Sequence, residues 1–180
     1  MKINKTHFKD LFLIENYSYQ DKRGAFSEIS RSDLLNSYLS YEFNSCQLNL
    51  VKSKKNVVRG LHFQKPPFEQ SKLITVVEGE IIDVAVDMRK DSDNYGKYFS
   101  YLLSSKKHES IFIPKGFAHG YLTVSNSAIL IYQVDNYYNE GFENGISIHD
   151  GFLNINWGID KSQMIISEKD KSYPLYKWKK

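Results

Sequence analysis

Three ionisable residues, Arg59, His62 and Lys72, interrupt a stretch that otherwise has the composition of buried β-strands. They lie in VVRGLHFQKPPFEQSKLITVV, where a Lys-Pro-Pro turn separates two apolar runs. One explanation is that polar residues alternate along a solvated strand face. The other is a pocket that needs a base and cations, because imidazole has an ordinary pKa of about 6.5 and exchanges protons near neutral pH.

Further groups of this kind follow on separate predicted strands. His119 lies in the turn IPKGFAHG, and Tyr132 interrupts the apolar run AILIYQV. Inward-facing side chains of different strands meet inside a barrel or sandwich. A base, a cation and a phenol distributed in this way therefore indicate one pocket in a β-rich domain.

The elements that position these residues are predicted to be short strands. Strands at 12–19 and 25–30 precede one short helix at 32–40, which Ser32 or Asp33 would cap. Further strands are predicted at 46–53, 57–64, 72–79, 80–89, 97–104, 109–116, 119–125 and 128–138. Many short strands with frequent turns predict an all-β fold, here a cupin jelly-roll barrel with short peripheral helices.

Length and composition predict one globular domain over residues 1–180. Hydrophobic residues make up 41% of the 180 residues, enough for a full core. The net charge is +3 without a long block of one sign, which argues against nucleic acid as a partner. The chain has no signal-peptide core and no run of about 20 apolar residues. We therefore expect a cytoplasmic protein that does not enter a membrane.

Sulfur and metal chemistry are not indicated. Cys46 is the only cysteine, which excludes an internal disulfide and a thiolate metal site, and its predicted strand favours a small buried side chain. Cupin metal sites use two histidines two residues apart on one strand, but here the pattern is His62-Phe63-Gln64. We therefore expect a cupin that holds no metal and no other cofactor.

Long motifs carry a family resemblance. The run RGLHFQKPPFEQSKLITVVEGEIIDVAVDMRKDSDNYGK, followed by IPKGFAHGY and IYQVDNYY, resembles the dTDP-4-dehydrorhamnose 3,5-epimerase family, and the similarity extends from DKRGAFSE to SEKD, roughly Asp21 to Asp170. The resemblance implies a metal-free cupin homodimer that binds a nucleotide-diphosphate sugar. It would invert C3, C5 or both in a 4-keto-6-deoxy sugar and so supply surface polysaccharide synthesis.

The resemblance also implies catalytic roles. His62 would be the base, Lys72 would stabilise the enolate oxygen, and Tyr132 would return a proton on the far face of the sugar. Asp170 of SEKD would orient His62. Asp83 is an open alternative for that role, because it lies on the strand face opposite Ile82, Val84 and Val86 in EIIDVAVDM.

A binding set follows from motif positions. The diphosphate would be held by Arg59 and Arg23, because guanidinium groups pair well with phosphate oxygens. Arg59 and His62 would face opposite sides of an ideal strand, so both serve one site only if Gly60 marks a bulge or a strand end. Phe26 is a candidate stacking surface, and the N-terminal segment is expected to cross to a partner subunit. The remaining members are Glu28, Gln47, Asn49, His119, Tyr138 and Glu143.

The chain departs from the family pattern after Tyr138, the last residue of IYQVDNYY. Asn139 stands where a proline is common, and an Ile-His-Asp-Gly run occupies 148–151. This segment is predicted to shape the sugar or nucleotide end of the pocket. The sequence leaves open dTDP or GDP, a hexose or a heptose, and which centres are inverted. A 3,4-ketoisomerase and a non-catalytic sugar-nucleotide-binding cupin remain alternatives.

Overall fold

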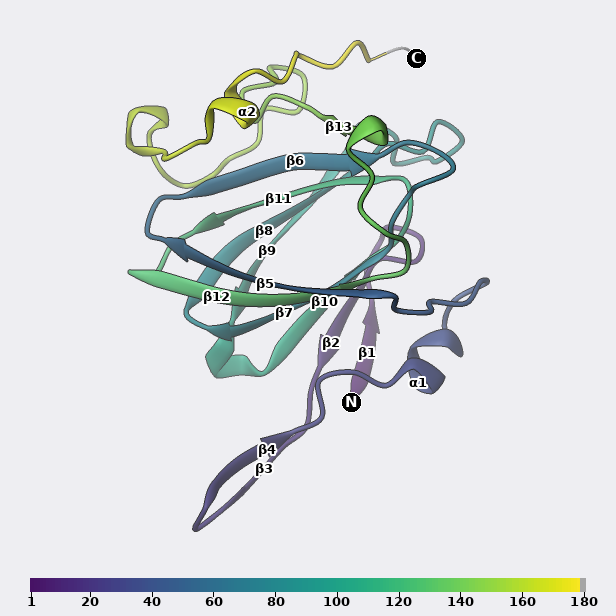
Figure 1. Ribbon diagram of the computed structural model, residues 1–180, viewed down its shortest axis with the longest axis vertical. Coiled ribbons are helices and arrows are strands. Elements are labelled where there is room, and N and C mark those ends of the chain that lie inside the picture. The colour runs from purple at the N-terminus through teal and green to yellow at the C-terminus, as the bar shows by residue number, and fades with distance from the viewer. Residues whose placement is uncertain (179–180) are drawn as a thin grey trace.

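The computed structural model describes residues 1–178, which form two antiparallel sheets packed face to face and a projecting hairpin (Figure 1). One sheet has the order β1-β2-β10-β7-β12-β5 and the other β13-β6-β11-β8-β9, while β3 and β4 form the hairpin. The strands are β1 (Lys2–Lys5), β2 (Phe12–Glu15), β3 (Ser18–Asp21), β4 (Gly24–Ser27), β5 (Gln47–Lys54), β6 (Val58–Gln64), β7 (Lys72–Glu78), β8 (Glu80–Asp87), β9 (Tyr98–Ser104), β10 (Glu109–Ile113), β11 (Phe117–Thr123), β12 (Ser127–Val134) and β13 (Glu143–Gly145). The helices are α1 (Ser32–Asn36) and α2 (Glu168–Lys171), with 3-10 turns η1 (Ser105–Lys107), η2 (Glu140–Phe142) and η3 (Lys161–Gln163). The predicted all-β fold with short peripheral helices is confirmed.

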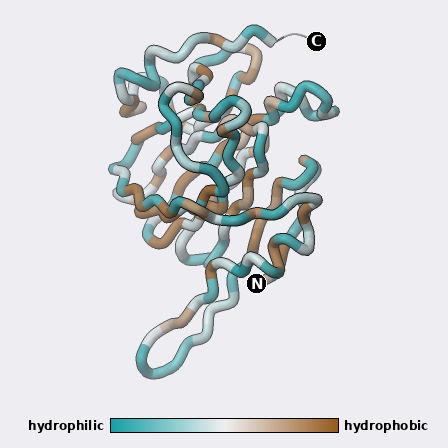
Figure 2. Tube along the Cα trace, turned by 45° about the vertical axis from the view of Figure 1, so that its right-hand side comes forward, coloured by the Kyte–Doolittle hydropathy of each residue, from teal (hydrophilic) through white to brown (hydrophobic). Residues whose placement is uncertain are grey.

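Both faces of the central strands are covered, which explains their apolar sequences. In β8, Ile81 and Ala85 belong to the core between the sheets, whereas Val84 and Val86 pack outward against the segment 146–166. On the larger sheet, α1 and the loop up to Phe43 cover the outer face of β1, β2, β10 and the start of β7. Figure 2 shows hydrophobic segments gathered in the barrel and a mostly hydrophilic hairpin tip.

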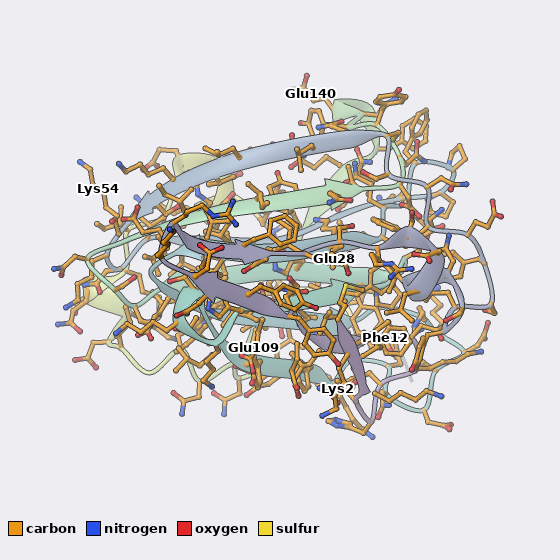
Figure 3. All side chains as sticks on the ribbon, turned by 90° about the horizontal axis from the view of Figure 1, so that it is seen from below. Lys2, Phe12, Glu28, Lys54, Glu109 and Glu140 are labelled. Atoms are coloured by element: carbon orange, nitrogen blue, oxygen red, sulfur yellow. The ribbon has the colours of Figure 1, made fainter. Side chains whose placement is uncertain are left out.

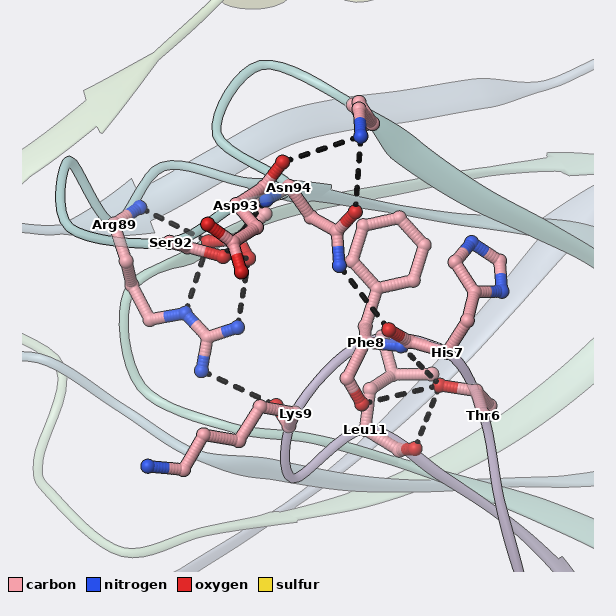
Figure 4. Close-up of polar contacts among 11 residues, drawn as sticks. Thr6, His7, Phe8, Lys9, Leu11, Arg89, Ser92, Asp93 and Asn94 are labelled. Carbon is pink, nitrogen blue, oxygen red and sulfur yellow. Dashed lines mark hydrogen bonds and ion pairs between the residues drawn. The ribbon is translucent and has the colours of Figure 1, made fainter.

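The N-terminal loop is tied to the barrel by side-chain to backbone hydrogen bonds (Figure 4). Asn94 donates to the carbonyl of His7 at 3.1 Å, and Arg89 donates to the carbonyl of Lys9 at 3.1 Å. The buried carboxylate of Asp87 holds the Arg89 guanidinium at 2.7 Å. These contacts keep the intervening Phe8 in the core between the sheets.

Three local predictions were wrong. Helix α1 has Arg31 as its N-cap without a side-chain hydrogen bond, because Ser32 already lies in the first turn. The predicted strand at 12–19 is divided into β2 and β3, since β2 pairs with β1 and β10 whereas β3 pairs with β4 in the hairpin. Cys46 is exposed and precedes β5, so it is not the small buried side chain we expected.

Candidate active site

A bulge in β6 brings Arg59 and His62 to the same side of the sheet. His119 of β11 pairs with His62, and Tyr121 pairs with Arg59, so β6 has one more residue than β11 between these pairs. Gly60 has φ +115°, and a Cβ there would meet Gly120 Cα at 2.5 Å. The bulge therefore needs glycine in both strands. The bulge at Gly60, which the sequence required if Arg59 and His62 are to serve one site, is therefore present.

Asp170 orients the imidazole of His62. Its Oδ1 lies 2.8 Å from His62 Nε2, and its Oδ2 accepts the Gly60 N–H at 3.1 Å. Helix α2 holds this carboxylate, and Ser167 caps the helix by accepting the Asp170 N–H. Burial would raise the pKa of Asp170, but the hydrogen bond and charge of His62 and the Gly60 N–H outweigh it and lower that pKa. The group is therefore an ionised carboxylate at neutral pH.

Asp83 has a different partner. Its Oδ2 lies 2.7 Å from His119 Nε2, and the Asp83 side chain is fully buried. Asp83 faces the space between the sheets, as the strand pattern predicted. The choice that the sequence left open is decided by geometry, because Asp170 contacts His62 and Asp83 contacts His119.

Two adjoining cavities lie between the sheets and share His62, Lys72 and Tyr132. The inner cavity, about 250 Å³, is also lined by Val51, Arg59, Ile74, His119, Gly120, Tyr121 and Leu130. The outer cavity, about 310 Å³, is also lined by Gln47, Asn49, Phe63, Gln64, Gln70, Tyr138 and Glu143. His62 comes from β6 and Tyr132 from β12, so the two side chains enter from opposing sheets.

Burial shifts the pKa of two of the shared residues, Lys72 and Tyr132. Burial lowers the pKa of Lys72 to about 8, although Asp83 and Glu143 act in the opposite direction. Burial raises the pKa of Tyr132, opposed by Arg59 and assisted by Glu143, so the phenol keeps its proton at neutral pH. The cavity thus holds a cation with reduced solvation and a proton donor.

A charged cluster forms the edge of the outer cavity. Tyr138 donates to Glu143 Oε2 at 2.6 Å, and Lys169 forms an ion pair with the same oxygen. Burial would raise the pKa of Glu143, but the hydrogen bonds from Lys169 and Tyr138 outweigh it and lower that pKa. The sequence interpretation missed Lys169, although it lies beside Asp170 in the SEKD motif.

A second missed group holds Arg59. Its Nε donates to Ser53 Oγ at 3.1 Å, and Ser53 Oγ lies 2.9 Å from the Tyr121 hydroxyl. This hydrogen-bond chain holds Nε of the Arg59 guanidinium at the wall of the inner cavity. Alternation along β5 is the only sequence signal for Ser53, since inward-facing positions 47, 49, 51 and 53 recur at a period of two.

Three predicted binding residues lie away from these cavities. Arg23 and Phe26 lie on the β3–β4 hairpin, where Arg23 pairs with Asp21 and Phe26 is 69% exposed. Glu28 follows the hairpin and lies well apart from Glu140, which begins the turn before Glu143 (Figure 3). Within one chain, therefore, this part of the predicted binding set does not converge.

The Ile-His-Asp-Gly run also lies elsewhere. Ile148, His149, Asp150 and Gly151 line a separate cavity of about 440 Å³ that shares no residue with the other two. Of the segment 139–151 that was predicted to shape the pocket, Glu143 lines the outer cavity. The prediction is wrong for the Ile-His-Asp-Gly run, because Ile148 packs into the apolar layer outside the smaller sheet.

Within residues 1–178, no group of three or more His, Cys, Asp or Glu side chains has an arrangement that could hold a metal ion. Among the same residues, no helix is long and apolar enough to cross a membrane.

Comparison with known proteins decides the family. Residues 5–177 match the family described as dTDP-4-dehydrorhamnose 3,5-epimerase. The chain belongs to this family.

Individual relatives agree over nearly the full length. A dTDP-4-dehydrorhamnose 3,5-epimerase of Escherichia coli is 37% identical over 171 residues, which are 95% of this chain and 92% of that protein. The crystal structure of the enzyme of this name from Elizabethkingia anophelis superposes with a TM-score of 0.93, at 38% identity, over 98% of this chain and 96% of that one. A dTDP-6-deoxy-D-glucose-3,5-epimerase from Legionella pneumophila, in complex with dTDP-4-keto-L-rhamnose, gives a TM-score of 0.91 at 36% identity, over 97% of this chain and 92% of that one. The predicted family and cupin jelly-roll fold are confirmed.

Proposed function

We propose that this protein epimerises C3 and C5 of a dTDP-linked 4-keto-6-deoxyhexose. A ketone at C4 acidifies the hydrogens on C3 and C5, so a positioned base can form an enolate. The proton leaves and returns at the same oxidation level, and the proposed reaction therefore involves no net redox change. The observation that supports this reaction best is the His62–Asp170 pair, which enters the cavities from the sheet opposite Tyr132, with Lys72 in the shared wall.

The geometry supports a distinct role for each group. A carboxylate at Nε2 favours the imidazole tautomer with its proton there, which leaves Nδ1 of His62 to accept the sugar proton. Asp170 then stabilises the imidazolium. The Lys72 ammonium lies in a poorly solvated site, where it can neutralise charge that develops on the C4 oxygen. Tyr132 donates from the other sheet, and delivery to the opposite face of the enolate inverts the centre.

Deuterium incorporation tests the reaction. The protein is incubated in D₂O with dTDP- and GDP-linked 4-keto-6-deoxyglucose, and deuterium in the sugar is counted by mass spectrometry. Two deuterons with the dTDP sugar are expected, and one would restrict the reaction to a single centre. His62→Ala should abolish incorporation and keep sugar-nucleotide affinity within about tenfold. His149→Ala, which alters a histidine of the separate cavity, is the matched control.

Other outcomes contradict the proposal. A product whose carbonyl has moved to C3, seen by NMR, would indicate the ketoisomerase, and binding without any incorporation would indicate the non-catalytic cupin. Reaction only with the GDP sugar would refute the choice of nucleotide.

We also propose a homodimer in which the hairpin completes the partner's site. The hairpin projects from the barrel with Phe26 and Tyr19 exposed, and the edge strand β5 exposes Leu48 and Leu50 (Figure 1). Large exposed apolar side chains favour a protein partner. In such a dimer, the guanidinium of Arg23 would reach the diphosphate in the cavity of the other subunit.

Mixing two inactive variants tests this arrangement. Arg23→Ala and His62→Ala chains, unfolded together and refolded, should recover roughly a quarter of wild-type activity, because half of the dimers are mixed and one site in each is intact. No recovery would place Arg23 in the site of its own chain. A monomer at micromolar concentration in sedimentation experiments would refute the dimer itself.

Supply of a 6-deoxysugar for surface polysaccharide is the proposed role of the product. A cytoplasmic location and a single domain over 1–180 remain predictions from the sequence.

A further inference from the structure

The segment after helix α2 lies against the His62–Asp170 pair. We call residues 172–178 the C-terminal strap. Its first aromatic residue, Tyr173, places its ring edge-on to the imidazole of His62, with ring centroids 5.5 Å apart and an interplanar angle of 65°. The Tyr173 N–H also bonds the carbonyl of Asp170 at 3.4 Å. The strap thus continues directly from the residue that orients His62.

A glycine makes room for this ring. Gly145 of β13 is the register partner of His62, and a Cβ on Gly145 would meet ring carbons of Tyr173 at 2.4 Å. The Tyr173 ring therefore fills the space that a side chain at position 145 would occupy. Without the ring, water and other imidazole rotamers would have access to that space.

The Ile-His-Asp-Gly run holds the strap in place. Asp150 is buried, and its carboxylate accepts the Tyr176 N–H at 2.8 Å and the Trp178 indole N–H at 3.2 Å. The Ser147 N–H bonds the carbonyl of Pro174 at 3.0 Å. In Figure 1 this segment runs over the smaller sheet, above β6. The departure from the family pattern at 148–151 thus coincides with the anchor of the strap.

We propose that Tyr173 is a positioning residue for the base His62, pressed against the imidazole by the strap that Asp150 fastens. Asp170 fixes one ring nitrogen but leaves the ring able to tilt about that bond. The Tyr173 edge restricts this motion and shields the hydrogen bond from water. Tyr173 lines neither the inner nor the outer cavity, so its action reaches the substrate through His62.

Substitutions at Tyr173 separate positioning from general stability. Tyr173→Ala should lower kcat about tenfold to a hundredfold, the range expected when a catalytic group is misplaced, and change KM less than about twofold. Tyr173→Phe keeps the ring and should restore kcat to within about twofold of wild type. Leu175→Ala alters an exposed side chain of the same strap and should leave both constants unchanged. The His62 ring signals in NMR spectra should be sharp in wild type and Tyr173→Phe, and broadened in Tyr173→Ala.

Gly145→Ala gives an independent check through a double-mutant cycle. Its Cβ should push the Tyr173 ring from His62 and lower kcat in the wild-type background. In the Tyr173→Ala background the space is open, so the same change should have no further effect. Independent, multiplying losses would overturn the proposal. So would full kcat in Tyr173→Ala, an equal loss in Tyr173→Phe, or an equal loss in Leu175→Ala.

The inference rests on the proposed epimerase function, and the two can fail separately. A wild-type protein that incorporates no deuterium refutes the function. An active wild type with an equally active Tyr173→Ala variant refutes only the role of Tyr173.

Discussion

Replacing Lys72 with methionine is expected to stabilise the protein below pH 8 and to reduce its activity. Burial lowers the pKa of the Lys72 ammonium from 10.5 to about 8, although the negative charges of Asp83 and Glu143 act to raise that pKa. The difference between these values corresponds to about 3 kcal/mol by which the charged form weakens folding. Methionine has a similar length and carries no charge, so it removes this cost.

The pH dependence follows from the sign of the shift. Below pH 8, Lys72 is protonated in both the folded and the unfolded chain, and folding bears the full cost. Between pH 8 and 10.5 the folded chain releases the proton while the unfolded chain keeps it. The wild-type protein therefore gains stability over this range relative to Lys72→Met. The stability gap between the two proteins should shrink by about 2 to 3 kcal/mol from pH 7 to pH 10.

Activity should change in the opposite sense. Loss of one charge that stabilises an oxyanion typically lowers kcat by about 10² to 10³. The same ammonium would thus weaken folding and assist catalysis, which is common for groups in functional sites.

Urea unfolding at several pH values and deuterium exchange measure the two effects. Lys5→Met is the matched control, because Lys5 is an exposed strand lysine of β1. The difference in unfolding free energy between wild type and Lys5→Met should not shrink between pH 7 and 10 as it is predicted to do for Lys72→Met. A constant gap for Lys72→Met would show that the ammonium is not desolvated. Unchanged kcat in that variant would remove Lys72 from the proposed mechanism.

Three further substitutions test the supports of the site. Asp170→Asn preserves the shape but removes the charge that stabilises the imidazolium, so kcat should fall at least about 100-fold while calorimetric dTDP affinity is kept; normal kcat would exclude Asp170 as the partner of His62. Gly120→Ala places a Cβ 2.7 Å from the Arg59 carbonyl oxygen, and thermal unfolding should show a loss of about 1–3 kcal/mol. A melting temperature equal to that of wild type would show that β6 and β11 accommodate the added Cβ without loss of stability. Asp150→Ala removes the acceptor of the partly buried Tyr176 and Trp178 N–H groups of the strap and of the buried Leu153 N–H, and should cost about 2–4 kcal/mol in urea unfolding. Wild-type stability there would contradict its role as the anchor.

Much of the fold could be predicted because it is local. Alternation of apolar residues and the turn residues between them determine strands over a few positions, and the predicted strands from β5 to β12 are present. The same alternation predicted that Asp83 faces inward. The sequence also indicates His62, Lys72 and Tyr132 as candidate catalytic residues, because burying a charged or phenolic side chain in an apolar strand costs free energy unless the group has a partner or a function.

Long-range pairing was beyond the sequence. His62 and Asp170 are 108 positions apart, and Asp83 has the same residue type and a suitable strand face, so only the packed structure shows that it belongs to His119. Tyr173 and Gly145 likewise meet only because β13 and the strap pack beside β6.

The sequence by itself determined which residues can be buried and which carry chemistry, because burial and protonation depend on side-chain type and local spacing. Tertiary structure decided which groups are partners, through the bulge at Gly60, the capped helix that carries Asp170, and the strap fastened by Asp150. The physical reason is range. A hydrogen bond or ring contact acts over a few ångströms, and the segments that it joins are brought that close only when the whole core has packed.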